Sequence, residues 1–400
     1  MSSALWRNRD YVLLWSGQAL SDIGGAVSEL AFPLLVLSLT HAPVAAGFAA
    51  ALRTLPAPFF GLFAGVLVDR WNRKRVMLWC DIGRALSLAS IPIAFVLGYL
   101  TIWQLYLTAL VEGTLLVLFK LAKTAAISEV VTEKQLAPAM AQEEFVEGTT
   151  ALFGPPLSGF LYTLGQTLPF IADALSYGAS ILTLLLIRTP FQKERAASRR
   201  SLRTEVSEGF VWMWHQPFIR AMSLLSGATA LVLPGSVLIV IILAQQQGAS
   251  AFMIGVIFAA GGIGAILGSL AASFVGQRLT VGQSILLTRW FFALVWPLYA
   301  FAPYLFVLGA LDFGIGLVDP IEDVAYFSYR LKLIPDELRG RVISACRLFP
   351  SFMRPIGLAL TGILIQRIGV FTTIICFWVA LLLMAIYVAS NLHIREARFV

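Results

Sequence analysis

Apolar stretches of roughly 18 to 25 residues follow one another along the chain, and each is long enough for a helix to cross about 30 Å of hydrocarbon. Charged residues make up only 13% of the sequence, against about 25% in ordinary soluble domains. We therefore expect an all-α membrane protein. A membrane β-barrel is excluded, because its strands would alternate polar and apolar residues in segments of about 10 residues.

Breaks between the apolar stretches predict twelve membrane-spanning helices. Their ranges are 12–39, 43–67, 76–99, 102–122, 142–163, 167–187, 219–243, 251–275, 283–301, 304–326, 343–366 and 370–390. With the N-terminus inside, the Lys and Arg residues of the connections fall on the inner side, and Arg367 alone falls outside. The positive-inside rule then predicts a multi-pass protein of the bacterial plasma or inner membrane with both termini in the cytoplasm.

The longest connection divides the predicted spans six and six. We expect an N-terminal bundle over 1–187, a cytoplasmic linker over 188–218 and a C-terminal bundle over 219–400. The amphipathic run 205–214 suits a helix at the inner membrane surface, or equally a solvated linker that leads into the next span. Faint repetition favours two related halves, since Gly61 and Gly65 correspond in position to Gly264 and Gly268, and both pairs have the spacing for close helix packing.

The loop after the second span combines an acid with several cations. Gly65 and Asp69 are followed by Arg70, Arg73 and Lys74. A basic loop that only sets topology would explain the cations, but it would not explain an acid at the end of a helix. Such an acid can face the positive N-terminus of a neighbouring helix, and the cations can pair with acids or lipid headgroups.

These residues resemble the G-x-L-x-D-R-x-G-R-R/K signature of the major facilitator superfamily. The resemblance implies two pseudo-symmetric bundles of six helices and a cytoplasmic latch that involves Asp69, Arg70 and Arg73. Asn72 stands where the signature has Gly, and Asn tolerates the left-handed backbone conformation that Gly supplies.

Further segments resemble the exporters of that superfamily. Gly154, Pro155 and Gly159 are similar to the exporter signature G-P-x-x-G, with one more residue before the last Gly. The segments 5–9, 81–84, 173–177 and 334–341 resemble the branch that contains macrolide-efflux and enterobactin-exporting members. The resemblance therefore implies export rather than import.

Carboxylates inside the predicted spans are the main functional candidates, because an ionised group at the centre of a bilayer is costly. Asp22, Glu112 and Asp312 are the leading candidates for proton coupling. A carboxyl group in an apolar cavity is able to take up a proton near neutral pH. For each of the three, the alternatives are an interhelical pair and a carboxyl group that stays protonated. The fourth span carries Glu112 and lacks the Arg that many antiporters of the superfamily have there.

Other intramembrane charges have predicted partners. Glu29 is expected to pair with Arg53 at similar depth, and Asp81 with Arg84 on one helix face. The acids Asp319, Glu322 and Asp323 in the tenth span are expected to pair with the bases Arg347 and Arg354 in the eleventh. Arg354 lies near the middle of its span and is alternatively available to an anionic group on a substrate.

The sequence argues against other classes of function. It has no nucleotide-binding P-loop, and its histidines and three cysteines lack metal-ligand spacing, so no enzyme activity, catalytic residue, metal or cofactor is expected. The predicted function is a proton-coupled antiporter that exports a lipophilic or amphipathic compound such as a drug, macrolide or siderophore. The expected partners are this small molecule, protons and membrane lipids, but no nucleic acid, and the chain is expected to be a monomer. The alternatives are a non-transporting receptor or scaffold and a lipid or lysolipid flippase.

Overall fold

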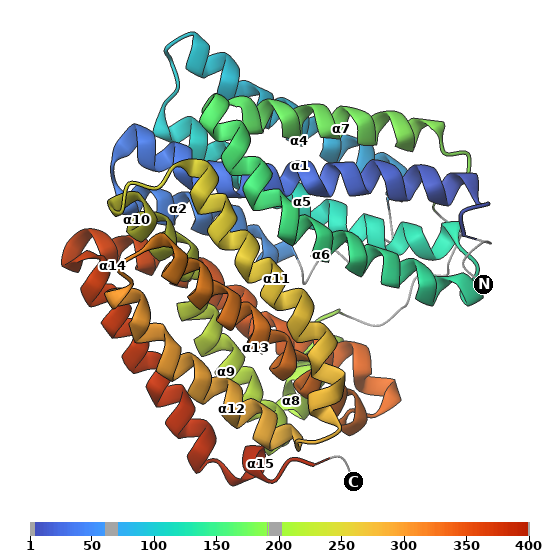
Figure 1. Cartoon of the computed structure of the whole chain (residues 1–400). Helices are drawn as coiled ribbons and strands as arrows, with labels where there is room; N and C mark the ends of the chain where they lie inside the picture. Colours follow the sequence, from blue (N-terminus) through green and yellow to red (C-terminus); the bar gives the residue numbers. More distant parts are fainter. Residues whose placement is uncertain (1–4, 61–70, 190, 192–201, 399–400) are drawn as a thin grey trace. The chain divides into compact units, whose positions relative to one another are not determined.

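The computed structural model describes residues 5–60, 71–189, 191 and 202–398, and every regular element within these ranges is a helix (Figure 1). The chain forms two compact units. The first consists of Met1–Ala197 with Ser250–Gly255, and the second of Ser198–Ala249 with Val256–Val400. The division into bundles at 187 and 219 stays a prediction.

Within the described residues before 190, the first unit has six helices with defined bounds. Their bounds are α1 Arg9–Thr40, α2 Pro43–Thr54, α4 Arg73–Val96, α5 Ile102–Val130, α6 Glu133–Leu164 and α7 Leu168–Leu186. Local residue chemistry explains several helix starts: the side chains of Asn8 and Thr101 cap α1 and α5, and a proline opens α2. Helix α1 ends at His41, which has a φ of 50°. Helix α1 packs mainly against α7 and α6.

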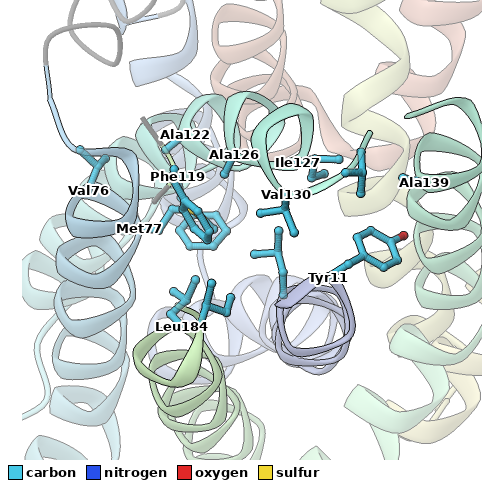
Figure 2. Close-up of a cluster of buried hydrophobic side chains, with 14 of the residues drawn as sticks. Tyr11, Val76, Met77, Phe119, Ala122, Ala126, Ile127, Val130, Ala139 and Leu184 are labelled. Atoms are coloured by element: carbon cyan, nitrogen blue, oxygen red, sulfur yellow. The ribbon is translucent and has the colours of Figure 1, made fainter. Parts of the chain in front are cut away.

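One end of the first unit is held by a cluster of buried apolar side chains from several helices. Met77 of α4, Phe119 of α5 and Leu184 of α7 lie together in this cluster, and Tyr11 of α1 points toward Ala139 of α6 (Figure 2). Such helices lie in lipid before they associate, so close packing stabilises their association more than the hydrophobic effect does. The cluster fixes the positions of α1, α4, α5 and α7, which carry the polar groups described below.

The second unit contains the remaining described helices, except that residues 251–255 of α11 belong to the first unit. Their bounds are α8 Leu202–His215, α9 Pro217–Val232, η2 Leu233–Gly235, α10 Ser236–Gln246, α11 Ala251–Gly276, α12 Val281–Val295, η3 Trp296–Phe301, α13 Leu305–Leu333, η4 Asp336–Leu338, α14 Arg339–Ser390 and α15 Leu392–Arg395. Helix α14 turns at Gly369, whose φ of 82° favours glycine. It therefore supplies both the eleventh and the twelfth predicted spans.

Each predicted span falls on a helical segment, as far as its residues are described. In the described residues, eight segments are long and apolar enough to cross a membrane. One of them, Asp336–Ser390, includes the two predicted spans that α14 supplies. Three predicted spans are not among the eight. The span 43–67 extends beyond the described residues, and the spans on α6 and α13 carry several acidic residues.

Glycines allow two helices of the second unit to touch. A Cβ atom on Gly264 would lie 2.2 Å from the carbonyl oxygen of Phe313, and one on Gly268 would lie 2.2 Å from that of Leu317. The close packing predicted for this glycine pair of α11 is therefore confirmed, and its partner is α13. The corresponding Gly61 and Gly65 lie outside the described residues.

The amphipathic run 205–214 forms most of α8. Arg341 of α14 forms an ion pair with Glu208 of α8, at 2.5 Å between Nη1 and Oε2. The basic residues Lys193, Arg195, Arg199 and Arg200 of the predicted linker lie outside the described residues. Contact of α8 with the membrane surface stays a prediction.

Candidate functional site

A cavity of about 420 Å³ lies within the first unit, between α1, α2, α4, α5 and α6. Its volume falls in the range typical of small-molecule sites. Its wall includes apolar side chains such as Leu116 and Phe119. The ionisable residues of the wall are four acids and four bases, namely Asp22, Glu29, Glu143, Glu147, Arg53, Arg84, Lys120 and Lys123. The cavity suits an amphipathic molecule that carries polar or charged groups.

Lys123 joins two acids of the cavity wall. Its Nζ atom lies 3.0 Å from Oδ2 of Asp22 on α1 and 2.5 Å from Oε2 of Glu143 on α6. The proton-site candidate Asp22 therefore has a cationic partner. Sequence reasoning missed Lys123 because it ended the fourth span at residue 122, whereas α5 continues to Val130.

Glu112 also has a partner, on a neighbouring helix. Nε and Nη2 of Arg84 lie 2.8 and 2.7 Å from Oε1 of Glu112, and the Tyr177 hydroxyl donates to the same oxygen at 3.0 Å. The Arg84 guanidinium lies over the Tyr177 ring, 4.3 Å from its centroid. The side chains of Arg84 and Glu112 are 5% and 2% exposed. This is the most deeply buried ion pair in the described part of the first unit.

The structure corrects the predicted pairing of Asp81 with Arg84. Arg84 directs its hydrogen bonds across to α5, while Asp81 accepts a hydrogen bond from Ser180 of α7 at 2.6 Å. The Ser180 hydroxyl in turn accepts from Gln18 of α1 at 2.8 Å. Helix α4 packs against both α5 and α7, so each of its two charged residues has a nearer partner on another helix.

Glu29 and Arg53 form no ion pair within the described residues, contrary to prediction. Both line the cavity, where Glu29 is exposed and Arg53 half-buried. The backbone of Arg53 lies against α5: a Cβ atom on Gly113 would lie 1.9 Å from the Arg53 carbonyl oxygen. This contact fixes the position of α2 on α5, and the two side chains are left facing the cavity.

Asp312 is the candidate carboxylate without a cationic partner in the described part of the chain. It lies on α13, where the Tyr299 hydroxyl donates to its Oδ1 at 3.5 Å. A Cβ atom on Gly261 would lie 2.3 Å from its Oδ2, so glycine leaves room for the carboxyl group. Asp22 and Glu112 thus each have a described cationic partner, whereas Asp312 has none in the described residues.

A second cavity, of about 390 Å³, lies within the second unit beside α9, α12, α13 and α14. Asp319, Glu322, Asp323 and Arg354 line it together with Arg289 of α12. Glu322 forms an ion pair with Arg289, which also donates to the Thr229 hydroxyl at 2.7 Å. The structure therefore corrects the predicted partner of Glu322, an Arg of the eleventh span, to Arg289, which sequence reasoning missed. Arg347 forms no ion pair in the described residues.

Of the predicted latch residues, Gly65, Asp69 and Arg70 lie outside the described residues. Arg73 and Lys74 open α4 and contact their own unit. Arg73 Nη1 lies 3.3 Å from Oε1 of Glu129 and donates to the carbonyl oxygen of Ala125 at 3.2 Å. Lys74 donates to the carbonyl oxygen of Ile187 at 2.7 Å, just after α7. Cations at helix C-termini are stabilising, so both residues hold the first unit together, and a latch function stays a prediction.

Asn72 does not adopt the left-handed conformation that the sequence suggested. Its φ is −65°, and its side chain accepts a hydrogen bond from the backbone N–H of Arg75 at 3.2 Å. Asn72 therefore acts as the N-cap of α4, a role for which Asn is well suited.

The segment resembling the exporter signature packs α6 against α1. A Cβ atom on Gly154 would lie 2.5 Å from Cβ of Ala26. Helix α6 continues through Pro155 to Gly159, which is buried. Ser158 between them donates to the carbonyl oxygen of Val27 at 2.6 Å. The small residues thus allow close approach of the two helices, as their spacing predicts.

A comparison with known families identifies the chain. The sequence profile of the Major Facilitator Superfamily matches residues 14–353. The chain belongs to this superfamily. It is therefore a transporter of a small-molecule substrate and a multi-pass membrane protein, and not an enzyme.

Characterised and uncharacterised relatives share about a quarter of its residues. The macrolide efflux protein A of Streptococcus pyogenes is 25% identical over 372 residues, which cover 91% of each chain. The multidrug efflux pump Tap of Mycolicibacterium fortuitum is 26% identical over 389 residues and 93% of each chain. An uncharacterized MFS-type transporter of Bacillus subtilis, YfiS, is 25% identical over all of this chain and 97% of its own.

Solved transporter structures share the fold. A bacterial homologue of the iron transporter ferroportin, in an inward-facing state, superposes with a TM-score of 0.76 at 14% identity, covering 96% of this chain and 98% of its own. A bacterial homologue of the human lysosomal transporter Spinster gives the same TM-score and identity over 98% and 99% of the two chains. Together with the helices described above, they establish the major facilitator fold of this chain.

Proposed function

We propose that this transporter is a proton-driven exporter of lipophilic or amphipathic small molecules. The direction and the substrate class are supported by the macrolide and multidrug efflux proteins among its relatives, and by the Gly154–Gly159 segment, which resembles an exporter signature. The observation that carries the coupling is the position of Asp312, a carboxylate within the membrane-spanning part of the chain for which no described cation is a partner. Such a group is neutral only when it binds a proton.

The cavity of the first unit supports an amphipathic substrate. An apolar body would contact side chains such as Leu116 and Phe119, while a positive group would meet Asp22 and Glu143. Lys123 already occupies these two carboxylates, so a substrate amine would compete with the Lys123 ammonium group. Alternating access, in which the two halves of such a transporter move around a central site, would then release the substrate outside.

The test is an accumulation assay in efflux-deficient cells that express the transporter. A panel of lipophilic drugs, dyes, macrolides and siderophores is measured with and without a protonophore. We expect lower accumulation of at least one compound and restoration by the protonophore. If no compound is affected while the protein is present in the membrane, the proposed export of such compounds is wrong.

Asp312→Asn tests the coupling. It removes the titratable group and keeps the volume, so we expect normal expression and loss of protonophore-sensitive efflux. Asp336→Asn is the matched control, because Asp336 is exposed and pairs only with Arg339 on the surface. Unchanged efflux by the Asp312 variant would show that protons are not coupled through this residue.

A further inference from the structure

Asp173 on α7 is a buried carboxylate that opens the segment 173–177, and the proposed function gives it no role. It is 0% exposed. Its Oδ2 lies 2.5 Å from the hydroxyl oxygen of Ser28 on α1, and its Oδ1 lies 3.3 Å from that of Ser176. Among the described residues, every hydrogen-bond partner of this carboxyl group is thus a serine hydroxyl. No Lys or Arg of the described residues donates to it.

One consistent arrangement of the hydrogen atoms around Asp173 places one of them on the carboxyl group itself. The Ser28 oxygen also lies 3.1 Å from the carbonyl oxygen of Gly25, and the Ser176 oxygen lies 2.8 Å from the carbonyl oxygen of Asp173. A hydroxyl group has one hydrogen to donate. If the serines donate to these carbonyls, an ionised Asp173 receives no hydrogen bond. A protonated Asp173 donates to Ser28, which in turn donates to Gly25, and each group is satisfied.

The charges near Asp173 favour the same protonation state. The groups that act on it are Glu112 on α5, Arg84 on α4, Arg53 on α2, Tyr177 on α7 itself and Ser28 on α1. Arg84 is bound to Glu112. Glu112 Oε2 is already buried without a hydrogen-bond partner in the described residues. An ionised Asp173 would place a second carboxylate beside it to which no described Lys or Arg donates a hydrogen bond, and such a charge is costly in a buried site.

Asp173 lies directly behind the wall of the first cavity. Gly25 and Arg84 belong to that wall, and the Gly25 carbonyl accepts from Ser28. The adjacent residue of α1 is also a glycine. A Cβ atom on Gly24 would lie 2.7 Å from Asp173 Oδ1 and 2.2 Å from Ser176 Oγ, so the carboxyl group reaches α1 only because Gly24 has no side chain.

We propose that Asp173 is a proton-binding residue that carries a proton in this conformation and releases it when positive charge enters the cavity of the first unit. On release, the O–H bond of the carboxyl group breaks and the proton passes to water in the cavity. The incoming cation stabilises the carboxylate that remains, because like any nearby positive charge it favours the ionised form. The release of the proton on entry of a cation rests on the proposed function, whereas the protonation of Asp173 does not depend on it.

The protonation of Asp173 is tested by infrared spectroscopy of the purified transporter in lipid nanodiscs at neutral pH. We expect the wild type to show the C=O stretch of protonated carboxylic acids, and Asp173→Asn to lose one component of it. Glu129→Gln is the matched control. The side chain of Glu129 is also buried, but Arg73 Nη1 lies 3.3 Å from its Oε1, so we expect it to be ionised. Glu129→Gln is therefore expected to keep the whole band.

A band that is unchanged in Asp173→Asn overturns the proposal. If Asp173→Asn does not fold, the infrared band of Ser28→Ala is measured instead. That variant removes the acceptor of the carboxyl proton, so the component is expected to change frequency without losing area. An unaltered frequency in Ser28→Ala also contradicts the proposal.

The release of the proton is tested with tetraphenylphosphonium as the cationic probe, in a weakly buffered solution that contains a pH indicator. We expect the wild type and Glu129→Gln to release protons when the probe binds, and Asp173→Asn to release fewer. Equal release from all three overturns the coupling to Asp173. If the probe does not bind to the wild type, the substrate class of the proposed function and the coupling to this cation are both wrong, while the infrared band still decides whether Asp173 carries a proton.

Discussion

Removing Arg84 leaves Glu112 as an uncompensated charge in the interior of the first unit. Arg84→Met keeps most of the side-chain volume and deletes both contacts to Glu112, at 2.8 and 2.7 Å. Breaking a buried ion pair by removing one partner costs about 3–5 kcal/mol. The lost stacking of Arg84 on Tyr177 adds about 1 kcal/mol. We therefore expect the free energy of unfolding to fall by about 3–5 kcal/mol or slightly more. This change corresponds to a roughly thousandfold increase in the unfolding equilibrium constant.

The pairing itself is measured by a double-mutant cycle. Glu112→Gln removes the charge that Arg84→Met leaves unpaired, so the double variant is expected to recover about 2 kcal/mol or more of the loss. Unfolding is followed by the fluorescence of the protein's 10 Trp residues, in micelles of a mild detergent titrated with sodium dodecyl sulfate. The control is Asp336→Asn, whose ion pair with Arg339 lies on the surface and contributes little.

Two results would refute this reasoning. The first is a decrease in the free energy of unfolding of Arg84→Met that is no larger than the decrease in Asp336→Asn. The second is simple additivity in the double variant, since additive effects mean that Arg84 and Glu112 do not interact. Average hydrogen bonds between membrane helices measure about 0.6 kcal/mol in such cycles, so a coupling of that size would show that Glu112 is not held as a buried ion.

Two further predictions concern helix packing and the cytoplasmic loop. Gly113→Ala places a Cβ atom 1.9 Å from the Arg53 carbonyl oxygen, so we expect α2 to shift from α5 and the free energy of unfolding to fall by about 1–3 kcal/mol in the same titration. Gly148→Ala, which meets no atom within 4 Å, is its control, and equal losses in the two would contradict the steric argument. Asp69→Asn is expected to reduce efflux severalfold with little loss of protein from the membrane, because it removes a latch and leaves the cavity intact, and unchanged efflux in the accumulation assay would argue against the latch.

The helices were largely predictable from the sequence, but their ends were not. The predicted fourth span ends at residue 122, whereas α5 continues to Val130, and α6 begins at Glu133 rather than at 142. These helices extend through charged residues that a hydropathy reading places in the connection. Lys123 and Glu143, which pair with each other in the cavity wall, lie at or beyond those predicted ends. Charge in this protein therefore marks the wall of a polar cavity as well as the end of a span.

The partners of the charged residues were the least predictable part of the site. Spacing along one helix predicted Asp81 as the ion-pair partner of Arg84. Chain order predicted that the partner of Glu322 would be an Arg of the eleventh span. In the structure, Arg84 forms an ion pair with Glu112, and Glu322 forms one with Arg289. The sequence shows which spans carry charged residues, and this signal does not say which helix supplies the partner.

The sequence by itself determined that this protein is a helical membrane transporter of the major facilitator superfamily, and which of its spans carry charge. It determines this because a membrane span must satisfy its backbone hydrogen bonds within its own segment, so that length and hydropathy are sufficient to define a helix. Only the tertiary structure decided that Lys123 neutralises Asp22, that Arg84 neutralises Glu112, and that Asp173 and Asp312 have no described cation as hydrogen-bond donor. These pairings depend on the rotation and depth of each helix against its neighbours, which arise from the packing of many side chains at once and are not encoded in the spacing along any one helix.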